Sequence, residues 1–219
     1  MSTLRSQANS RKLVIGQDSL DGDLIRPRNA KGLIIFAHGS GSSRFSPRNA
    51  HVARQLQERG LGTLLLDLLT EQEAYHRRNV FDIPLLAGRL VDAVRFARSD
   101  TELSNLRIGL FGASTGAAAA LVAAAQLPQE VAAVVSRGGR PDLAGKALKQ
   151  VHAATLLIVG GADYGVIELN RDALEVLTCE KQLEIVPGAT HLFEEPGTLD
   201  KVVDLAAQWF ITHFEAGKI

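Results

Sequence analysis

The sequence has little that would mark a secreted, membrane-bound or nucleic-acid-binding protein. Its 219 residues include one cysteine, Cys179. No internal disulfide can form, which excludes a disulfide-stapled fold and favours a reducing compartment. Lys+Arg and Asp+Glu both number 24, and this balance disfavours a nucleic-acid binder, which usually carries a basic surplus. The polar N-terminus, MSTLRSQANSRK, lacks the apolar core of a signal peptide.

Long apolar runs are also missing. The longest, around 117–125, is rich in alanine and too short to cross a bilayer. Hydrophobic residues make up 46% and charged residues 22%, as in ordinary globular proteins. We therefore expect a soluble cytoplasmic protein with no membrane or nucleic-acid partner, either monomeric or homodimeric. Its length suits one domain over 1–219, in which residues 1–10 are expected to be flexible.

Short apolar runs alternate with longer amphipathic stretches along the whole chain. Buried strands are expected at 32–37, 63–69, 107–111, 131–135, 155–159 and 182–186, and helices at 49–60, 81–98, 114–126, 199–214 and around 172–177. Strands that are apolar throughout and separated by helices predict a doubly wound, mainly parallel α/β sheet. Segments 13–15 and 24–25, either side of Asp21-Gly22, are expected to form an antiparallel edge hairpin. Functional residues of such sheets follow the carboxyl ends of strands.

The segment Gly112-Ala113-Ser114-Thr115-Gly116 fits G-x-S-x-G between an expected strand and an expected helix. This spacing places a serine on a sharp, strained turn, where the glycines let strand and helix approach closely. The helix N-terminus then directs free N–H groups at a developing oxyanion. Ser114 is therefore the candidate nucleophile. The alternative is a glycine-rich turn in which Ser114 only caps the helix.

A serine nucleophile needs a histidine that takes its proton and a carboxylate that orients the histidine. After Ser114, Asp163 follows one expected strand and His191 follows the next, in the chain order that this architecture uses. Asp142, after the preceding strand, is the alternative acid, with Arg140 as its expected ion-pair partner. The alternative for Asp163 is a turn or helix cap, and for His191 a surface-loop histidine.

A loop of small residues, 38–42, follows the first buried strand. Its backbone N–H groups are expected to face the nucleophile, with the N–H of Ser40 and that of Thr115 forming an oxyanion hole. Gly41 competes with Ser40 for this role. His38 is expected to brace the loop by hydrogen bonding, and a phosphate-binding nest is the alternative use of the loop.

Other kinds of site find little support. Gly109, Gly112 and Gly116 do not fit G-x-G-x-x-G, and no phosphate-binding P-loop pattern exists. The six histidines show no metal-ligand spacing. No metal and no cofactor are therefore expected, and Cys179 is interpreted as a structural thiol.

The segments HGSGSS, GASTGA, GGAD and PGATH, in this order, resemble the α/β-hydrolase superfamily over nearly the whole chain. Within it, HGSGSSRFSPRN, FDIPLLAGRLVDA and IVPGATHLFEEPG resemble the dienelactone-hydrolase-like group. The resemblance implies a compact α/β-hydrolase sheet without a cap domain, with Ser114 as nucleophile, Asp163 as acid and His191 as base. True dienelactone hydrolases carry cysteine in the elbow, so dienelactone is not carried over as the substrate.

Together these features predict a serine esterase for small soluble carboxylic esters or lactones, working through an acyl-enzyme. Two other functions fit the same residues, a non-catalytic binding protein and an acyltransferase. No long insertion supplies a lid, which favours short acyl groups. Arg44, Arg137 and Arg140 follow strands or the 38–42 loop, and we expect them to bind the substrate together with Gly41, the arginines through a carboxylate on it. The alternative is that these arginines are structural and pair with carboxylates of nearby loops.

Overall fold

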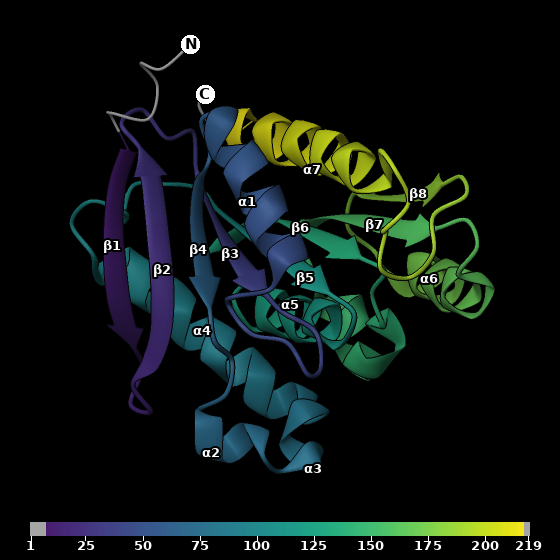
Figure 1. Ribbon diagram of the computed structural model, residues 1–219, viewed down its shortest axis with the longest axis horizontal. Helices are drawn as coiled ribbons and strands as arrows, with labels where there is room; N and C mark the ends of the chain where they lie inside the picture. The colour runs from purple at the N-terminus through teal and green to yellow at the C-terminus, as the bar shows by residue number, and fades with distance from the viewer. Residues whose placement is uncertain (1–7, 217–219) are drawn as a thin grey trace.

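A single eight-stranded sheet organises the chain, in a computed structural model that describes residues 8–216 (Figure 1). The strand order is β1-β2-β4-β3-β5-β6-β7-β8. The strands are β1 (Ala8–Ile15), β2 (Leu20–Pro27), β3 (Leu33–Ala37), β4 (Gly62–Leu66), β5 (Ile108–Ala113), β6 (Val131–Arg137), β7 (Ala154–Gly160) and β8 (Lys181–Val186). Neighbours from β4 to β8 pair in parallel, whereas β1–β2 and β2–β4 are antiparallel. The expected doubly wound, mainly parallel sheet is confirmed.

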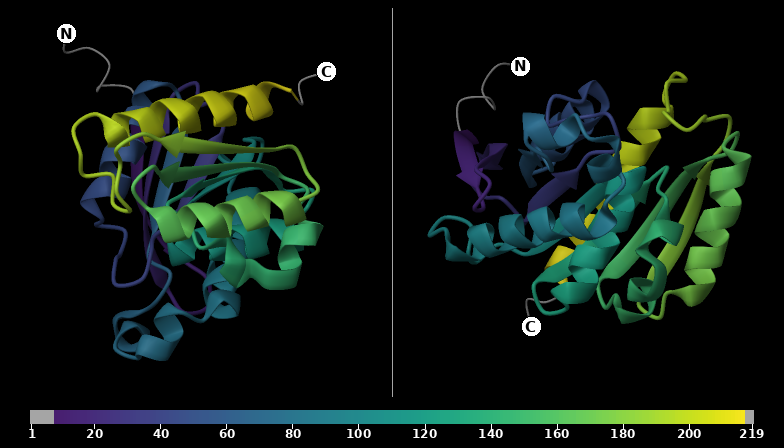
Figure 2. Two further views of the ribbon diagram at one scale, coloured as in Figure 1. Left: turned by 90° about the vertical axis from the view of Figure 1, so that its right-hand side faces the viewer. Right: turned by 90° about the horizontal axis from the view of Figure 1, so that it is seen from below.

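Helices cover both faces of this sheet (Figures 1 and 2). Besides the 3₁₀ segment η2 (Pro141–Gln150), they are α1 (Pro47–Glu58), α2 (Glu71–Ala74), α3 (Arg77–Val80), α4 (Ile83–Ser99), α5 (Thr115–Gln126), α6 (Tyr164–Val176) and α7 (Thr198–Glu215). Helices α1 and α7 pack on one face, and α4, α5 and α6 pack on the other. No cap domain interrupts this compact arrangement within residues 8–216.

The central strands are buried on both faces because their side chains alternate between two hydrophobic clusters. In β3, Ile34 and Phe36 point to the α1/α7 face, while Leu33 and Ile35 point to the opposite face. The rings of Phe36 and Phe111 lie 4.9 Å apart between centroids. This two-sided burial explains why each strand appears in the sequence as a continuous apolar run.

The edge hairpin exists, but its turn lies elsewhere than the sequence suggests. Strands β1 and β2 pair with Ile15 opposite Leu20, so residues 16–19 form the turn and Asp21-Gly22 lies inside β2. Gly16 and Ser19 both adopt positive φ, 73° and 53°. The Asp-Gly pair is a turn signal, but here the local backbone reversal occurs four residues earlier.

Two short helices between β4 and α4 are not anticipated from the sequence. Thr70 and Glu73 form a reciprocal capping box at the start of α2, with the Glu73 N–H bonding the Thr70 hydroxyl. The T-x-x-E spacing in the polar stretch 70–79 is the sequence pattern that could have predicted α2.

Residues 8–10 belong to β1, and residues 1–7 of the segment expected to be flexible lie outside the described part. None of the helices in residues 8–216 combines the length and apolar character needed to span a bilayer.

The sheet and α7 meet so closely at Gly109 that a methyl group there has no room. A Cβ at this position would lie 2.5 Å from Cε1 of Phe210, a ring that is fully buried. At Gly88, inside α4, an added Cβ would have no neighbour within 4 Å among residues 8–216 apart from the adjoining residues of the helix. We expect Gly109→Ala to lower the free energy of unfolding by about 1–3 kcal/mol through overpacking. Gly88→Ala is expected to raise it by about 0.5–1 kcal/mol through helix propensity.

Urea denaturation of the two variants beside the unmodified protein measures both changes. Equal stability of the two variants would contradict the packing described for Phe210.

Candidate active site

The candidate residues gather where the parallel strands end. Ser114 follows β5, Asp163 follows β7 and His191 follows β8, while the 38–42 loop follows β3. Because these strands run parallel in one sheet, their carboxyl ends share one edge. The loops expected from the sequence to carry function therefore lie together.

Ser114 occupies a strained turn between β5 and α5. Its φ and ψ are 51° and −121°, a conformation that side-chain-bearing residues rarely adopt. A Cβ at Gly112 would meet the Cα of Ala117 at 2.4 Å, and one at Gly116 would meet the carbonyl oxygen of Ala37 at 2.3 Å. The two glycines therefore permit the sharp turn. The Ser114 side chain makes no capping hydrogen bond to α5, which argues against the cap interpretation.

The loop after β3 passes directly beside Ser114. A Cβ at Gly39 would lie 3.1 Å from the Cβ of Ser114. Within residues 8–216, the backbone N–H groups of Ser40, Gly41 and Thr115 have no acceptor. Thr115 starts α5, so its N–H carries the positive end of the helix dipole. This arrangement offers donors for a developing negative charge on an oxygen.

His38 holds this loop against the end of β4. The residue is 8% exposed; Nδ1 donates to the carbonyl of Gly39 at 3.0 Å, and Nε2 accepts the N–H of Leu68 at 3.1 Å. This pattern requires the neutral ring. Burial lowers the pKa of His38, which favours the same neutral form. His38 therefore stabilises the loop by hydrogen bonding, as expected from the sequence, and both of its ring nitrogens are already bonded.

Asp163 and His191 form a close pair. His191 Nδ1 and Asp163 Oδ2 are 2.6 Å apart, with the carboxylate mostly buried and the ring partly exposed. Asp163 sits at the N-cap position of α6 but accepts no capping hydrogen bond there. Its side chain pairs with Nδ1 of the histidine, an arrangement that places the ring proton on Nδ1 and leaves Nε2 as the acceptor.

The same short turn contacts both His191 and Ser114. The carbonyl of Arg137 accepts the N–H of Ser114 at 3.3 Å. A Cβ at the next residue, Gly138, would lie 3.5 Å from Nδ1 of His191. Within the described part of the chain, the Ser114 hydroxyl forms no hydrogen bond with His191. Catalytic hydrogen bonds are often long without substrate, so this geometry is compatible with a triad.

The alternative acid, Asp142, is paired with an arginine and not with His191. Asp142 receives two parallel hydrogen bonds from Arg140, at 2.9 and 2.7 Å. This bidentate ion pair is the partnership anticipated from the sequence, and it also occupies the Arg140 guanidinium. Asp163 is the carboxylate that the structure brings to His191.

Arg44 is also held by carboxylates. Its guanidinium contacts Asp67, lies 3.0 Å from Asp21 and 3.4 Å from Asp23, and stacks 4.2 Å from the ring centroid of Phe45. The Arg44 N–H also donates to Asp67 at 2.7 Å. Sequence reasoning missed this network, although Asp67 directly follows a buried strand. The arginine ties the loop after β3 to β4 and β2.

Arg137 differs from the other two arginines. The residue is 7% exposed, and among residues 8–216 its Nε has no hydrogen-bond partner and no carboxylate pairs with its guanidinium. The guanidinium carbon lies 5.9 Å from the ring centroid of Phe193, next to the His191 loop. Burial, together with the charge of Arg48, lowers the pKa of Arg137 to about 10. Among residues 8–216, Arg137 is thus a buried cation with no counter-ion.

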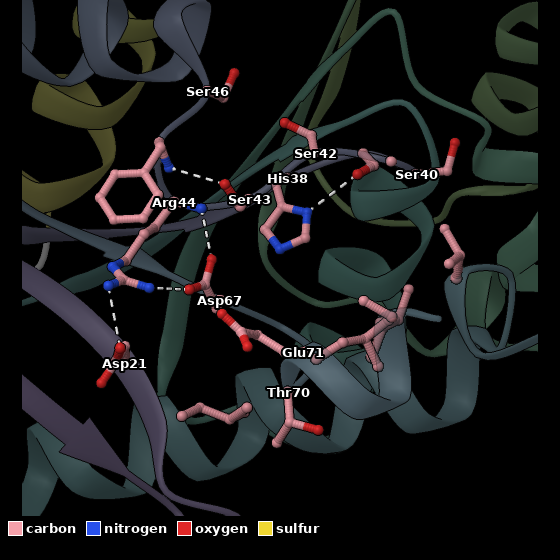
Figure 3. A pocket seen from close by; sticks show the side chains of 18 of the residues that line it. Asp21, His38, Ser40, Ser42, Ser43, Arg44, Ser46, Asp67, Thr70 and Glu71 are labelled. Carbon is pink, nitrogen blue, oxygen red and sulfur yellow. Dashed lines mark hydrogen bonds and ion pairs between the residues drawn. The ribbon is translucent and has the colours of Figure 1, made fainter. Parts of the chain in front are cut away.

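A pocket of about 810 Å³ opens beside the 38–42 loop (Figure 3). Ser40 and Thr115 contribute to its wall, so it adjoins the proposed oxyanion donors. Thr115 as a whole is 3% exposed, and within the described residues its buried Oγ1 has no hydrogen-bond partner. Sequence reasoning assigned only the backbone of Thr115, because its N–H position follows from the motif but its side-chain surroundings do not. No group of three or more potential metal ligands occurs in the described residues.

Relatives among curated proteins match most of this chain but under half of their own length. Two proteins from Mycobacterium tuberculosis strains, provisionally named phosphoribosyl transferases, are 55% identical over 202 residues. The match covers 92% of this chain and 46% of each relative.

Solved structures agree with the fold. A dienelactone hydrolase from Anabaena variabilis is 54% identical, covering 94% of this chain and 98% of its own, with a TM-score of 0.90. Est1E from Butyrivibrio proteoclasticus shares the fold at 16% identity, covering 96% of this chain and 100% of its own, with a TM-score of 0.76. The family model described as "Dienelactone hydrolase family" matches residues 20–210, a span that holds every candidate residue above. On sequence and on fold alike, the chain belongs to the dienelactone hydrolase family.

Proposed function

We propose that this protein is a serine hydrolase that cleaves small soluble carboxylic esters or lactones. The observation that carries the proposal is the 2.6 Å His191–Asp163 pair beside the strained elbow of Ser114. The free N–H groups of the adjoining loop support it, because acyl transfer needs donors for the carbonyl oxygen. Membership of a hydrolase family agrees with this reading.

The proposed reaction has two steps. The Ser114 hydroxyl oxygen attacks the carbonyl carbon while His191 Nε2 takes its proton. The bond from that carbon to the alcohol oxygen breaks, and the alcohol leaves with the same proton. Water then adds to the acyl carbon, giving a proton to His191, and the acid departs as the proton returns to Ser114.

Two other functions use the same residues. A non-catalytic binding protein would not form a covalent adduct at Ser114, and an acyltransferase would pass the acyl group to an acceptor other than water. Labelling by a fluorophosphonate, mapped by mass spectrometry, separates the first case. Partition of the acyl group between water and an added alcohol separates the second. The name phosphoribosyl transferase belongs to relatives whose matched part is 46% of their length. We therefore do not propose phosphoribosyl transfer for this chain.

Replacement of Ser114 tests the nucleophile. Ser114→Ala is expected to lower kcat for p-nitrophenyl acetate by at least about a thousandfold, because the attacking oxygen is gone. Thermal stability should stay the same, since the hydroxyl makes no capping bond. Ser104→Ala, outside the site, is the control. Retention of more than a few per cent of the activity at unchanged stability would show that Ser114 is not the nucleophile.

Paired replacements test the acid. Asp163→Asn is expected to lower kcat by about 10³ or more, because the amide no longer orients and stabilises the His191 ring. Asp142→Asn disturbs only the pair with Arg140 and is expected to change kcat less than about twofold. The measurement is kcat on p-nitrophenyl acetate for both variants. The opposite ranking would assign the acid to Asp142.

Substrate charge tests Arg137, which we propose as the contact for a carboxylate on the leaving-group side, next to His191. A charge-assisted hydrogen bond is worth about 1.5–3 kcal/mol, or about 10- to 150-fold in kcat/KM. 4-Acetoxybenzoate should therefore be preferred over its neutral methyl ester, and Arg137→Ala should remove this preference. Arg140→Ala, which disrupts an existing ion pair, is the matched control. Equal kcat/KM for the two esters in the unmodified protein would refute this role.

A further inference from the structure

The pocket beside the oxyanion loop lies on one particular side of Ser114. Its walls come from the loop after β3, the segment after β4 and the start of β2. In the sheet order these strands lie on one side of β5, while β6, β7 and β8 lie on the other. Asp163 and His191 follow β7 and β8. The pocket and the histidine therefore approach Ser114 from opposite sides.

This placement decides which part of an ester would occupy the pocket. The leaving alcohol oxygen must receive a proton from His191, so the alcohol lies on the histidine side. The carbonyl oxygen points at the N–H groups of Ser40 and Thr115, both of which belong to residues lining the pocket. The acyl chain, the remaining substituent of the carbonyl carbon, then extends into the pocket.

The walls are rich in hydroxyl groups, from five serines and two threonines. Thr115 is the best candidate among them for a hydrogen bond to the ligand, because its Oγ1 is buried without any partner in the described structure. A buried hydroxyl left unbonded is unfavourable, and a polar atom on a ligand would satisfy it. Apolar side chains, among them Leu20, Leu69 and Leu86, complete the lining.

The charges in the pocket disfavour an anion. Its charged side chains are three carboxylates, Asp21, Asp67 and Glu71, and one guanidinium, Arg44. Arg44 is already surrounded by carboxylates, as Figure 3 shows for Asp21 and Asp67. An acyl chain with a carboxylate would meet a net negative wall with no unpaired cation on it.

We propose that this pocket binds the acyl part of the substrate and selects a short, neutral, hydroxylated chain, with Thr115 Oγ1 as its hydrogen-bond partner. The substrates are then esters or lactones of small hydroxy acids. This inference rests on the proposed hydrolase function and adds the chemical class of the acyl group to it.

The first test compares kcat/KM on p-nitrophenyl esters of butyrate, 3-hydroxybutyrate, hemisuccinate and laurate. We expect 3-hydroxybutyrate to exceed butyrate by about three- to tenfold, the effect of one added neutral hydrogen bond. Hemisuccinate and laurate are expected to be slower than butyrate. A value for 3-hydroxybutyrate equal to or below that of butyrate overturns the inference while leaving the hydrolase intact. No turnover of any ester overturns the proposed function and this inference with it.

The second test removes the Thr115 hydroxyl with an isosteric change. In Thr115→Val the ratio of 3-hydroxybutyrate to butyrate kcat/KM is expected to fall to about one, without loss of Tm, because that hydroxyl has no partner within residues 8–216. The control is Thr155→Val, since the buried Thr155 hydroxyl donates to Ala153 at 3.0 Å. It should lower Tm and leave the ratio unchanged. An unchanged ratio in a folded Thr115→Val protein overturns the role of Thr115.

A third variant tests the negative charge of the pocket wall. The substituted residue, Glu71, is exposed, so the change is not expected to unfold the protein. Glu71→Lys is expected to raise kcat/KM for hemisuccinate relative to butyrate several-fold, because the pocket loses its negative excess. If hemisuccinate gains nothing, the acyl chain does not enter this pocket and the proposal is wrong.

Discussion

The arrangement of the candidate site depends on one close contact, that of the N-terminal turn of α5 with the end of β3. A Cβ at Gly116 would lie 2.3 Å from the carbonyl oxygen of Ala37 and 2.5 Å from that of His38. The contact sets Thr115 and Ser114 directly beside the loop that starts at His38. Any larger residue at Gly116 would push the helix away and separate the two candidate N–H donors. Helix, strand and loop are thus positioned together by the absence of one side chain.

Electrostatic contacts at the rim hold the rest of the loop in place. Arg44 connects it to the ends of β4 and β2 through three carboxylates, while His38 connects it to Leu68. Both contacts are made on the side away from Asp163 and His191, and His191 lies against the turn at Gly138. The two halves of the site are therefore supported by separate sets of contacts that meet at Ser114.

Much of this could be predicted from the sequence because the determining signals are local. Apolar runs gave the strands, and G-x-S-x-G placed Ser114, since strand, turn and helix are adjacent in the chain. The pairing of Arg140 with Asp142 was also predictable at a spacing of two residues. The contacts of Arg44 with Asp21 and Asp23, and the isolation of Arg137, were not, because they join segments far apart in sequence. The hairpin turn was misplaced because Asp-Gly is a frequent turn pair but not a sufficient one.

The neutral state of His38 makes the stability of the 38–42 loop depend on pH. Burial lowers its pKa, against the opposing effects of the Gly39 carbonyl and the Asp67 charge. Because the folded pKa is below that of the unfolded chain, this contribution to stability is complete above the ordinary histidine range and decreases as the pH falls. A proton on Nε2 would also remove the acceptor of the Leu68 N–H. Acid would therefore loosen the loop through a residue that takes no part in the chemistry.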